Sequence, residues 1–156
     1  MDRECVRELL TRYGDDVFRL AMSYLGNRAD AEDISQNVFL SALSTKCPPL
    51  PGKEKTWLLT CTANACRNHL KSFWRRNVGE IDETIAFHDA TDQTLYDAVM
   101  KLSPKYRSVI HLYYFEGYDQ NEIGEILHLT RTAVQTRMSR AREMLKKELT
   151  DDEGGL

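Results

Sequence analysis

Long apolar runs are absent from this sequence of 156 residues. A transmembrane helix needs about 20 consecutive, predominantly apolar residues, and no such run occurs here. The N-terminus, MDRECVRELL, is charged from its second residue and lacks the apolar core of a signal peptide. We therefore expect a cytoplasmic protein with no membrane insertion.

Cysteine and histidine are scarce, and their spacing matches no common metal or redox motif. The four cysteines form no C-x-x-C pair, and the four histidines are scattered over different segments. No phosphate-binding glycine loop is found, and no nucleophile is grouped with a base. We therefore expect no enzyme: no catalytic residue, no metal, no cofactor and no small-molecule substrate. The cysteines expected to be reduced, structurally ordinary thiols are Cys5, Cys47, Cys61 and Cys66.

A large excess of charge of either sign is also missing, since 21 Lys and Arg stand against 24 Asp and Glu. The charges are nonetheless unevenly placed. Residues 53–76 carry six basic residues and one acid, a balance of +5. Residues 77–98 carry six acids and no Lys or Arg (−6), and residues 125–147 carry six basic residues and two acids (+4). This pattern favours two polyanion-binding modules joined by an acidic linker.

What the sequence does contain is helical periodicity, with no strand pattern and no repeat, so we expect an all-α protein. Apolar residues recur at three- and four-residue steps over Val6–Tyr24, and Gly26 should end that helix. Asp30 is expected to cap a second helix, whose apolar run extends through Ile34, Val38, Leu40 and Leu43. Three of the four prolines cluster in PPLPG, which predicts a stiff loop.

A third helix is predicted over 55–76, with these side chains toward a core: Trp57, Leu58, Cys61, Ala65 and Leu70. Further on, LSPKYRSVIHLYYFEG predicts an apolar helix with Ser103 as N-cap, Pro104 in the first turn and Gly117 at its end. The resulting organisation is two small helical domains, 1–76 and 92–150, joined by an acidic linker at 77–91 and followed by a frayed tail at 151–156.

The segment EIGEILHLTRTAVQTRMSRARE has the pattern of a DNA-binding helix-turn-helix. A short helix that buries Ile123, Ile126 and Leu127 is followed by a turn at Leu129 and by a second helix. The second helix has a narrow apolar stripe, Val134, Met138, Ala141 and Leu145, and a polar far side. Arg and Gln on that side suit base edges, while Thr and Ser suit bases or phosphates. A solvated amphipathic helix is the alternative. The residues expected to face DNA are Arg131, Thr132, Gln135, Thr136, Arg137, Ser139 and Arg140.

The end of the third helix, KSFWRRN, places two aromatic residues beside two arginines. Aromatic rings stack on unpaired bases and cations follow phosphates, so this segment could bind single-stranded nucleic acid. The equally open alternative is that these aromatic side chains simply belong to the core. Asn64 and Asn68 lie four residues apart on one helix face, where an amide pair could contact base edges.

Taken together, these motifs resemble the sigma factors of the sigma-70 superfamily, specifically the small extracytoplasmic-function type. RADAEDISQNVFL resembles the family's D-A-E-D-x-x-Q-E-x-F-L helix, and TWLLTCTANACRNHLKSFWRR resembles its W-L-x-x-I-A-x-N segment. The helix-turn-helix segment resembles the family's C-terminal pattern, and the three motifs occur in the family's order. Departures include Asn37 in place of an acid, Gly124 in place of Ala, and Gln135 in place of Lys.

The resemblance implies a protein that binds core RNA polymerase and directs transcription initiation at promoters. The helix-turn-helix would bind the −35 element as duplex DNA, with Arg137, Arg140 and Arg142 as expected phosphate contacts, although the stem of Arg142 could instead pack near the apolar stripe. The third helix would capture the melted −10 element with the help of the loop at 48–53. The residues implied for the −10 element are Asn64, Arg67, Asn68, Lys71, Phe73, Trp74 and Arg75.

Partners follow from the same resemblance. The polymerase would offer its β′ clamp and its β flap, the promoter its DNA, and a cognate anti-sigma factor would hold the protein inactive. Two alternatives stay open at this point: a conventional helix-turn-helix regulator that is not a polymerase subunit, and a helical adaptor that binds no DNA. The residues implied for binding the β′ clamp are Asp30, Glu32, Asp33 and Gln36.

Overall fold

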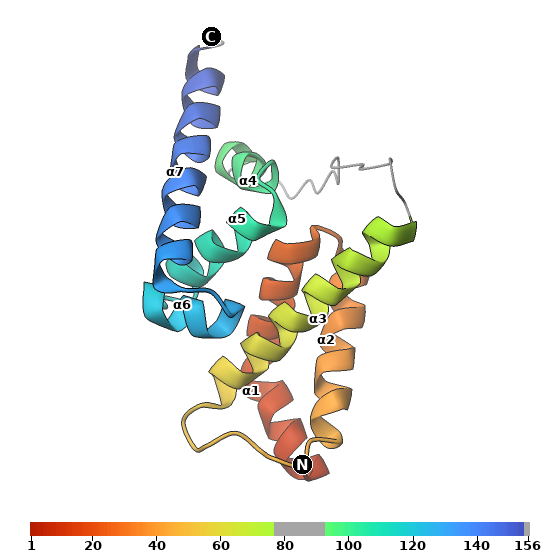
Figure 1. Ribbon diagram of the computed structural model, residues 1–156. Helices are drawn as coiled ribbons and strands as arrows, with labels where there is room; N and C mark the ends of the chain where they lie inside the picture. Colours follow the sequence, from red (N-terminus) through yellow and green to blue (C-terminus); the bar gives the residue numbers. More distant parts are fainter. Residues whose placement is uncertain (77–92, 155–156) are drawn as a thin grey trace. The chain divides into compact units, whose positions relative to one another are not determined.

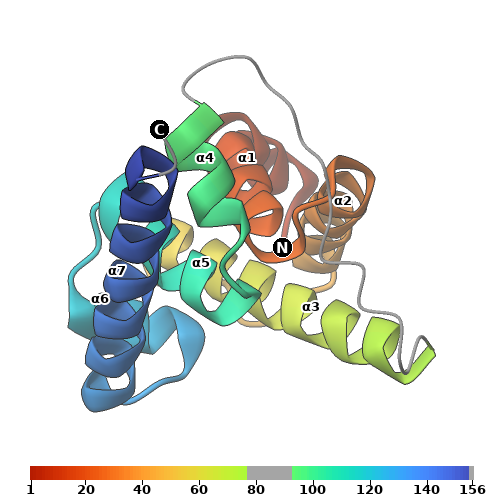
Figure 2. The same cartoon turned by 90° about the horizontal axis from the view of Figure 1, so that it is seen from above.

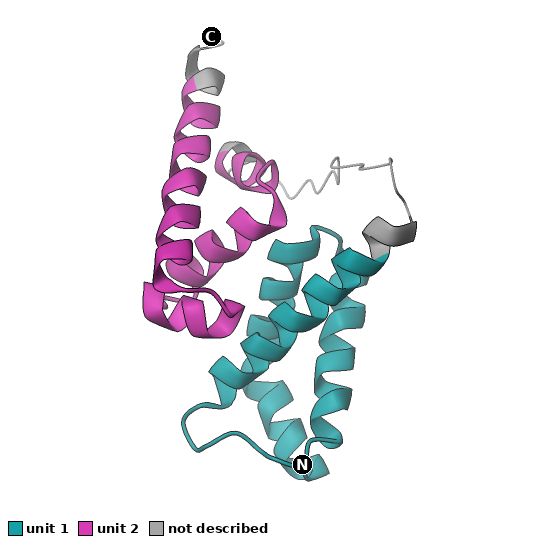
Figure 3. Cartoon of the chain, viewed as in Figure 1, with its two compact units in different colours: residues 1–81 teal, residues 82–156 magenta. Residues whose placement is uncertain are grey.

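The computed structural model describes residues 1–76 and 93–154, with side chains for residues 1–72 and 95–150. Every regular element in these ranges is a helix, so the predicted all-α fold is confirmed there. The chain forms two compact units, Met1–Ile81 and Asp82–Leu156 (Figure 3). The predicted linker at 77–91 lies outside the described residues.

Unit 1 consists of the helices α1 (Arg3–Leu25), α2 (Arg28–Leu43) and α3 (Glu54–Arg76). The first two run in opposite directions, and α3 crosses them diagonally and packs on both (Figures 1 and 2). Gly26 ends α1 in the left-handed conformation, φ +64°, and its N–H donates to the carbonyl of Met22 at 2.8 Å. This is the glycine C-cap that the sequence predicts.

The core of unit 1 is a set of side chains that are almost inaccessible to solvent. The hydroxyl of Thr62, the one polar side chain among them, donates to the carbonyl of Leu58 at 2.7 Å, so no unsatisfied donor is buried with it. The most deeply buried members are Val17, Leu20, Ala21, Ala31, Leu58, Leu59, Thr62, Ala63 and Cys66.

Several residues predicted to lie in this core lie on another side of their helix. The buried face of the helix is rotated about its axis relative to the prediction. Leu40 is 60% exposed and Leu43 38% exposed, whereas α2 buries Phe39 and Ala42 together with the predicted Ile34 and Val38. Successive residues of an α-helix are rotated by about 100°, so Leu40 lies on the side opposite to Val38. In α3 the buried stripe likewise includes Leu58 as predicted, whereas four other predicted core positions are only half-buried: Trp57, Cys61, Ala65 and Leu70.

Unit 2 contains α4 (Gln93–Met100), α5 (Pro104–Ile110), the π-helix η1 (His111–Phe115), α6 (Gln120–Leu127) and α7 (Arg131–Gly154). The long helix α7 packs against α4, α5 and α6, which gather along one of its sides (Figure 1). The side chains buried along α7 and the helices facing it include Val109, Leu112, Ile123, Ile126, Leu127, Val134, Met138 and Ala141.

The predicted helix from Ser103 to Gly117 is not one α-helix. Ser103 does occupy the N-cap position with Pro104 after it, but its side chain makes no capping hydrogen bond. After Ile110 the backbone widens into η1, where the N–H of Glu116 donates to the carbonyl of His111 at 3.2 Å, five residues earlier. Gly117 then ends the segment with φ +73°. A π-turn of this kind often marks a functional position.

We expect the core of unit 2 to depend on Met138, which is 1% exposed. Met138→Ala removes buried methylene and sulfur atoms and should lower the free energy of unfolding by about 2–5 kcal/mol. Thermal unfolding followed by circular dichroism measures the loss. The matched control is Met144→Ala on the same helix, since Met144 is 40% exposed and should lose far less. Equal losses in the two variants would contradict this description of the core.

The buried thiol of unit 1 provides a second prediction. Burial raises the pKa of Cys66 to about 12, with a smaller opposing effect of the Arg67 charge. The thiol is therefore almost entirely protonated at pH 8, and the thiolate is the reactive form. Mass spectrometry after alkylation at pH 8 should find the exposed Cys5 and Cys47 modified and Cys66 unmodified. If Cys66 in the folded protein were modified as fast as Cys5, the thiol would not be buried and protonated as described, and the prediction would be wrong.

Candidate functional site

The helix-turn-helix is formed by α6 and α7. Asp119 starts α6 with a capping box, in which its carboxylate accepts from the N–H of Glu122 at 2.9 Å and the Glu122 carboxylate accepts from the N–H of Asp119 at 3.1 Å. These two hydrogen bonds satisfy donors that the first turn of a helix leaves open. Thr130 likewise caps the start of α7, because its hydroxyl oxygen accepts a hydrogen bond from the N–H of Ala133 at 3.1 Å.

The turn between the two helices is tight. His128 takes the left-handed conformation, φ +55°, and the N–H of Leu129 donates to the carbonyl of Gly124 at 2.9 Å. A Cβ atom on Gly124 would lie only 2.7 Å from the carbonyl oxygen of Leu129, closer than real Cβ contacts come. Glycine at position 124, where the resemblance leads one to expect Ala, thus lets the turn close onto α6.

The two faces of α7 separate as the sequence predicts. Val134, Met138 and Ala141 are at most 1% exposed, while Leu145 is only half-buried. Of the seven side chains predicted to face DNA, Arg137 is half-buried and the other six are exposed: Arg131, Thr132, Gln135, Thr136, Ser139 and Arg140.

The cations of this face are uncompensated. Arg131, Arg137 and Arg140 have no hydrogen-bond or ion-pair partner among the described side chains. Elsewhere in the chain such partners are present, as in the ion pair of Lys101 with Glu148 at 3.2 Å. A solvated helix face usually mixes both signs of charge, so this face instead has the electrostatics of a phosphate-binding surface.

The polar face of α3 is only partly described. Asn64 is half-buried and its amide oxygen accepts from the guanidinium of Arg67, whereas Asn68 and Lys71 are exposed. This hydrogen bond joins two residues three positions apart on the same helix. The side chains of Phe73, Trp74 and Arg75 lie outside the described residues, so whether they stack on bases or pack in a core stays a prediction.

The loop that precedes α3 is held by its own backbone and by one carboxylate. The N–H of Lys53 donates to the carbonyl of Leu50 at 2.9 Å, and the N–H of Gly52 donates to Glu54 Oε2 at 2.9 Å. Gly52 has φ +86°, a conformation that favours glycine. Leu50 is 74% exposed at the tip of this loop, so a large apolar side chain is presented to solvent.

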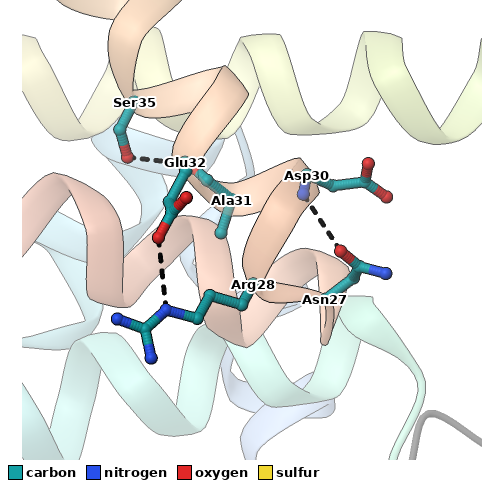
Figure 4. Close-up of polar contacts among 6 residues, drawn as sticks. All are labelled: Asn27, Arg28, Asp30, Ala31, Glu32 and Ser35. Carbon is teal, nitrogen blue, oxygen red and sulfur yellow. Dashed lines mark hydrogen bonds and ion pairs between the residues drawn. The ribbon is translucent and has the colours of Figure 1, made fainter.

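The acidic residues of the expected polymerase-binding motif lie at the start of α2, with Asp30 in the first turn and Glu32 after it (Figure 4). The cap is Asn27 and not Asp30, because the N–H of Asp30 donates to Asn27 Oδ1 at 3.0 Å. Asp30 instead lies in the first turn, where its carboxylate is 3.5 Å from His69 Nε2 on α3. Glu32 accepts from Arg28 Nε at 3.2 Å.

The remaining two residues of this motif differ from those pairs. Asp33 and Gln36 are exposed on α2 and have no side-chain partner among the described residues. Their polar atoms are therefore open to a binding partner without the loss of an internal contact.

One exposed aromatic cluster in η1 is not among the residues predicted from the sequence. Tyr113, Tyr114 and Phe115 follow one another in η1 and are 36%, 58% and 78% exposed. The signal was present as three consecutive aromatic residues, since an α-helix cannot turn three consecutive side chains toward one core.

Neither a metal centre nor a membrane span is found in the described part of the chain. No group of three or more His, Cys, Asp or Glu side chains could hold a metal ion there. Among the helices of the described ranges, none has the length and hydropathy needed to cross a bilayer.

Comparison with known proteins assigns the two units to one family. Residues 9–76 match the family model of Sigma-70 region 2, and residues 92–145 match the model of Sigma-70 region 4. The chain is 30% identical to the RNA polymerase sigma factor SigV of Bacillus subtilis, over 92% of this chain and 90% of that one. It is 28% identical to the ECF RNA polymerase sigma factor SigW of the same organism, over 96% and 91%.

A solved structure shares the fold. The sigma factor RpoE, in complex with the anti-sigma factor NepR from Bartonella quintana, superposes with a TM-score of 0.80 at 24% identity. The match covers 92% of this chain and 96% of that one. The chain therefore belongs to the extracytoplasmic-function group of the sigma-70 family of RNA polymerase sigma factors.

Proposed function

We propose that this sigma factor directs promoter-specific initiation by core RNA polymerase through three separate surfaces, on α7, α3 and α2. The observation that carries the proposal is the uncompensated cationic face of α7 within a helix-turn-helix. Membership of the family excludes the alternative of a conventional regulator that acts without being a polymerase subunit.

The −35 element is the ligand proposed for α7. Arg131, Thr132, Gln135 and Thr136 lie in the first two turns and are exposed, so they would contact base edges in the major groove. Arg137 and Arg140 would contact phosphates, with Ser139 between them. Base contacts specify the sequence, whereas phosphate contacts set the orientation and the salt dependence.

The −10 element is the ligand proposed for α3 and the loop at 48–53. Asn68 and Lys71 are exposed, and Asn64 and Arg67 form a polar pair beside them. With Phe73, Trp74 and Arg75, these side chains would hold bases that have left the duplex. Capture of unpaired bases can offset an unpairing cost of a few kcal/mol per base, so melting needs no ATP.

Core polymerase is the partner proposed for the first turns of α2. Asp33 and Gln36 would make the principal contacts with the β′ clamp, and Asp30 and Glu32 would add charge of the same sign. The β flap would bind unit 2. A cognate anti-sigma factor is a further proposed partner, supported by the similar structure in which a sigma factor is bound to one.

The first prediction of this proposal concerns polymerase binding. The double variant Asp33→Lys, Gln36→Ala should lose co-elution with bacterial core RNA polymerase, because it reverses one exposed charge and removes one exposed amide from the contact. Glu8→Lys, a charge reversal at an exposed position of α1, is the matched control and should still co-elute. Unchanged co-elution of the double variant would overturn the assignment of α2.

The second prediction separates base contacts from phosphate contacts on α7. Gln135→Ala should relax sequence preference at one or two positions of the −35 element, at a cost of about 1–3 kcal/mol for the preferred sequence. Arg140→Ala should instead weaken binding to all sequences alike and reduce the salt slope by about 0.9. Selection of bound duplexes from a random pool, followed by salt titration, measures both effects. Identical behaviour of the two variants would refute the division.

A further inference from the structure

Arg142 of α7 contacts two of the exposed aromatic residues of η1, Tyr113 and Tyr114. Arg142 Nε donates to the hydroxyl oxygen of Tyr114 at 3.1 Å, so the two elements are linked across 28 positions of sequence. The guanidinium carbon also lies 5.5 Å from the ring centroid of Tyr113 and 6.0 Å from that of Tyr114. These distances are within the range of cation–π attraction.

Tyr113 and Tyr114 together form the contact surface for this guanidinium, which we call its seat. Their ring centroids are 4.9 Å apart and their planes are inclined at 77°, an edge-to-face arrangement. Both rings lie within 6.0 Å of the Arg142 guanidinium carbon. The arginine is therefore fixed by one hydrogen bond and by contacts with two rings, although its side chain is exposed.

The seat orients Arg142 without neutralising it. A guanidinium has five N–H donors, and the hydrogen bond to Tyr114 uses the one on Nε. The terminal nitrogens have no hydrogen-bond or ion-pair partner among the described residues. Arg28 differs, because its charge is paired with a carboxylate: its Nε donates to Glu32 at 3.2 Å. An oriented guanidinium with its terminal fork open suits an anion that accepts two hydrogen bonds, such as a phosphate.

Arg142 continues one edge of the proposed duplex-binding face. At about 100° per residue, Arg131, Gln135 and Arg142 fall within a strip about 40° wide, and Arg142 lies roughly 16 Å along the axis from Arg131. A duplex that receives the first turns of α7 in its major groove would bring its backbone toward this edge. A protein carboxylate could also fit the open fork, but the charges that share this edge favour a polyanion.

We propose that Arg142 binds a backbone phosphate of the duplex and that Tyr113 and Tyr114 are its positioning residues. The duplex-binding surface then extends along α7 to Arg142. This inference rests on the proposed binding of duplex DNA by α7, and it adds two positioning residues on η1 that lie outside that helix.

The test uses the full chain and a short mixed-sequence DNA duplex, with affinity measured over a series of KCl concentrations. Arg142→Ala should reduce the slope of log affinity against log salt by about 0.9, because one phosphate contact is lost. Arg12→Ala is the matched control: it removes the same charge from an arginine that lies over a tyrosine ring, 5.8 Å from the centroid of Tyr13 in unit 1. Its slope should equal that of the unchanged protein.

Tyr114→Phe isolates the positioning role, since it removes only the hydroxyl that accepts from Arg142. The Arg142 charge remains, so the salt slope should stay the same while affinity falls about three-fold at every salt concentration. In the Arg142→Ala background the same change should have no effect. A structural role of Tyr114 alone would lower affinity equally in both backgrounds, and that result would overturn the proposal.

Other outcomes are equally decisive. If the unchanged protein binds the duplex and Arg142→Ala binds it with the same slope, the Arg142 inference fails and the proposed function stands. If that variant instead loses core polymerase in co-elution, the arginine binds a protein carboxylate, which also overturns the inference. If the unchanged protein does not bind duplex DNA even at low salt, the proposed role of α7 fails as well.

Discussion

The burial of one narrow stripe of α7 decides what every other side chain of that helix can do. Val134, Met138 and Ala141 are at most 1% exposed, and about 3.6 residues per turn then fix the direction of all their neighbours. A rotation by one residue would turn Gln135, Ser139 and Arg142 toward the core. Burying an unpaired arginine costs several kcal/mol, so the rotated helix is not an accessible alternative. Core packing thereby orients the DNA-binding face.

Uncompensated charge on that face costs the folded protein little. An exposed ion pair contributes only about 0–1 kcal/mol, so leaving Arg131 and Arg140 without carboxylates sacrifices little stability. The same cations gain much more in a complex, since each phosphate contact releases counterions from the duplex. The fold can therefore keep its recognition face unpaired, whereas buried groups such as Thr62 must have their partner in place.

Periodicity predicted the fold and the two faces of α7, because both follow from burial of a regular stripe. It failed where a choice depended on neighbouring elements. Asn27 and Asp30 are both good capping residues, and the ending of α1 at Leu25, with Gly26 as its C-cap, places Asn27 directly before α2 as its N-cap. The π-turn at 111–115 changes the period for a single turn, too briefly for a pattern in sequence to reveal it. The seat of Arg142 depends on that turn and was missed with it.

The acidic motif of α2 shows how internal contacts rank residues that look equivalent in sequence. Asp30 and Glu32 already interact with His69 and Arg28, so a polymerase surface must compete with those contacts. Asp33 and Gln36 have no such contact to lose. Each of these exposed internal ion pairs contributes at most about 1 kcal/mol of stabilising free energy. Losing that amount on docking would still lower the binding affinity several-fold. In the proposed complex with core polymerase, Asp33 and Gln36 would therefore contribute most of the binding free energy, while Asp30 and Glu32 would chiefly stabilise the start of α2.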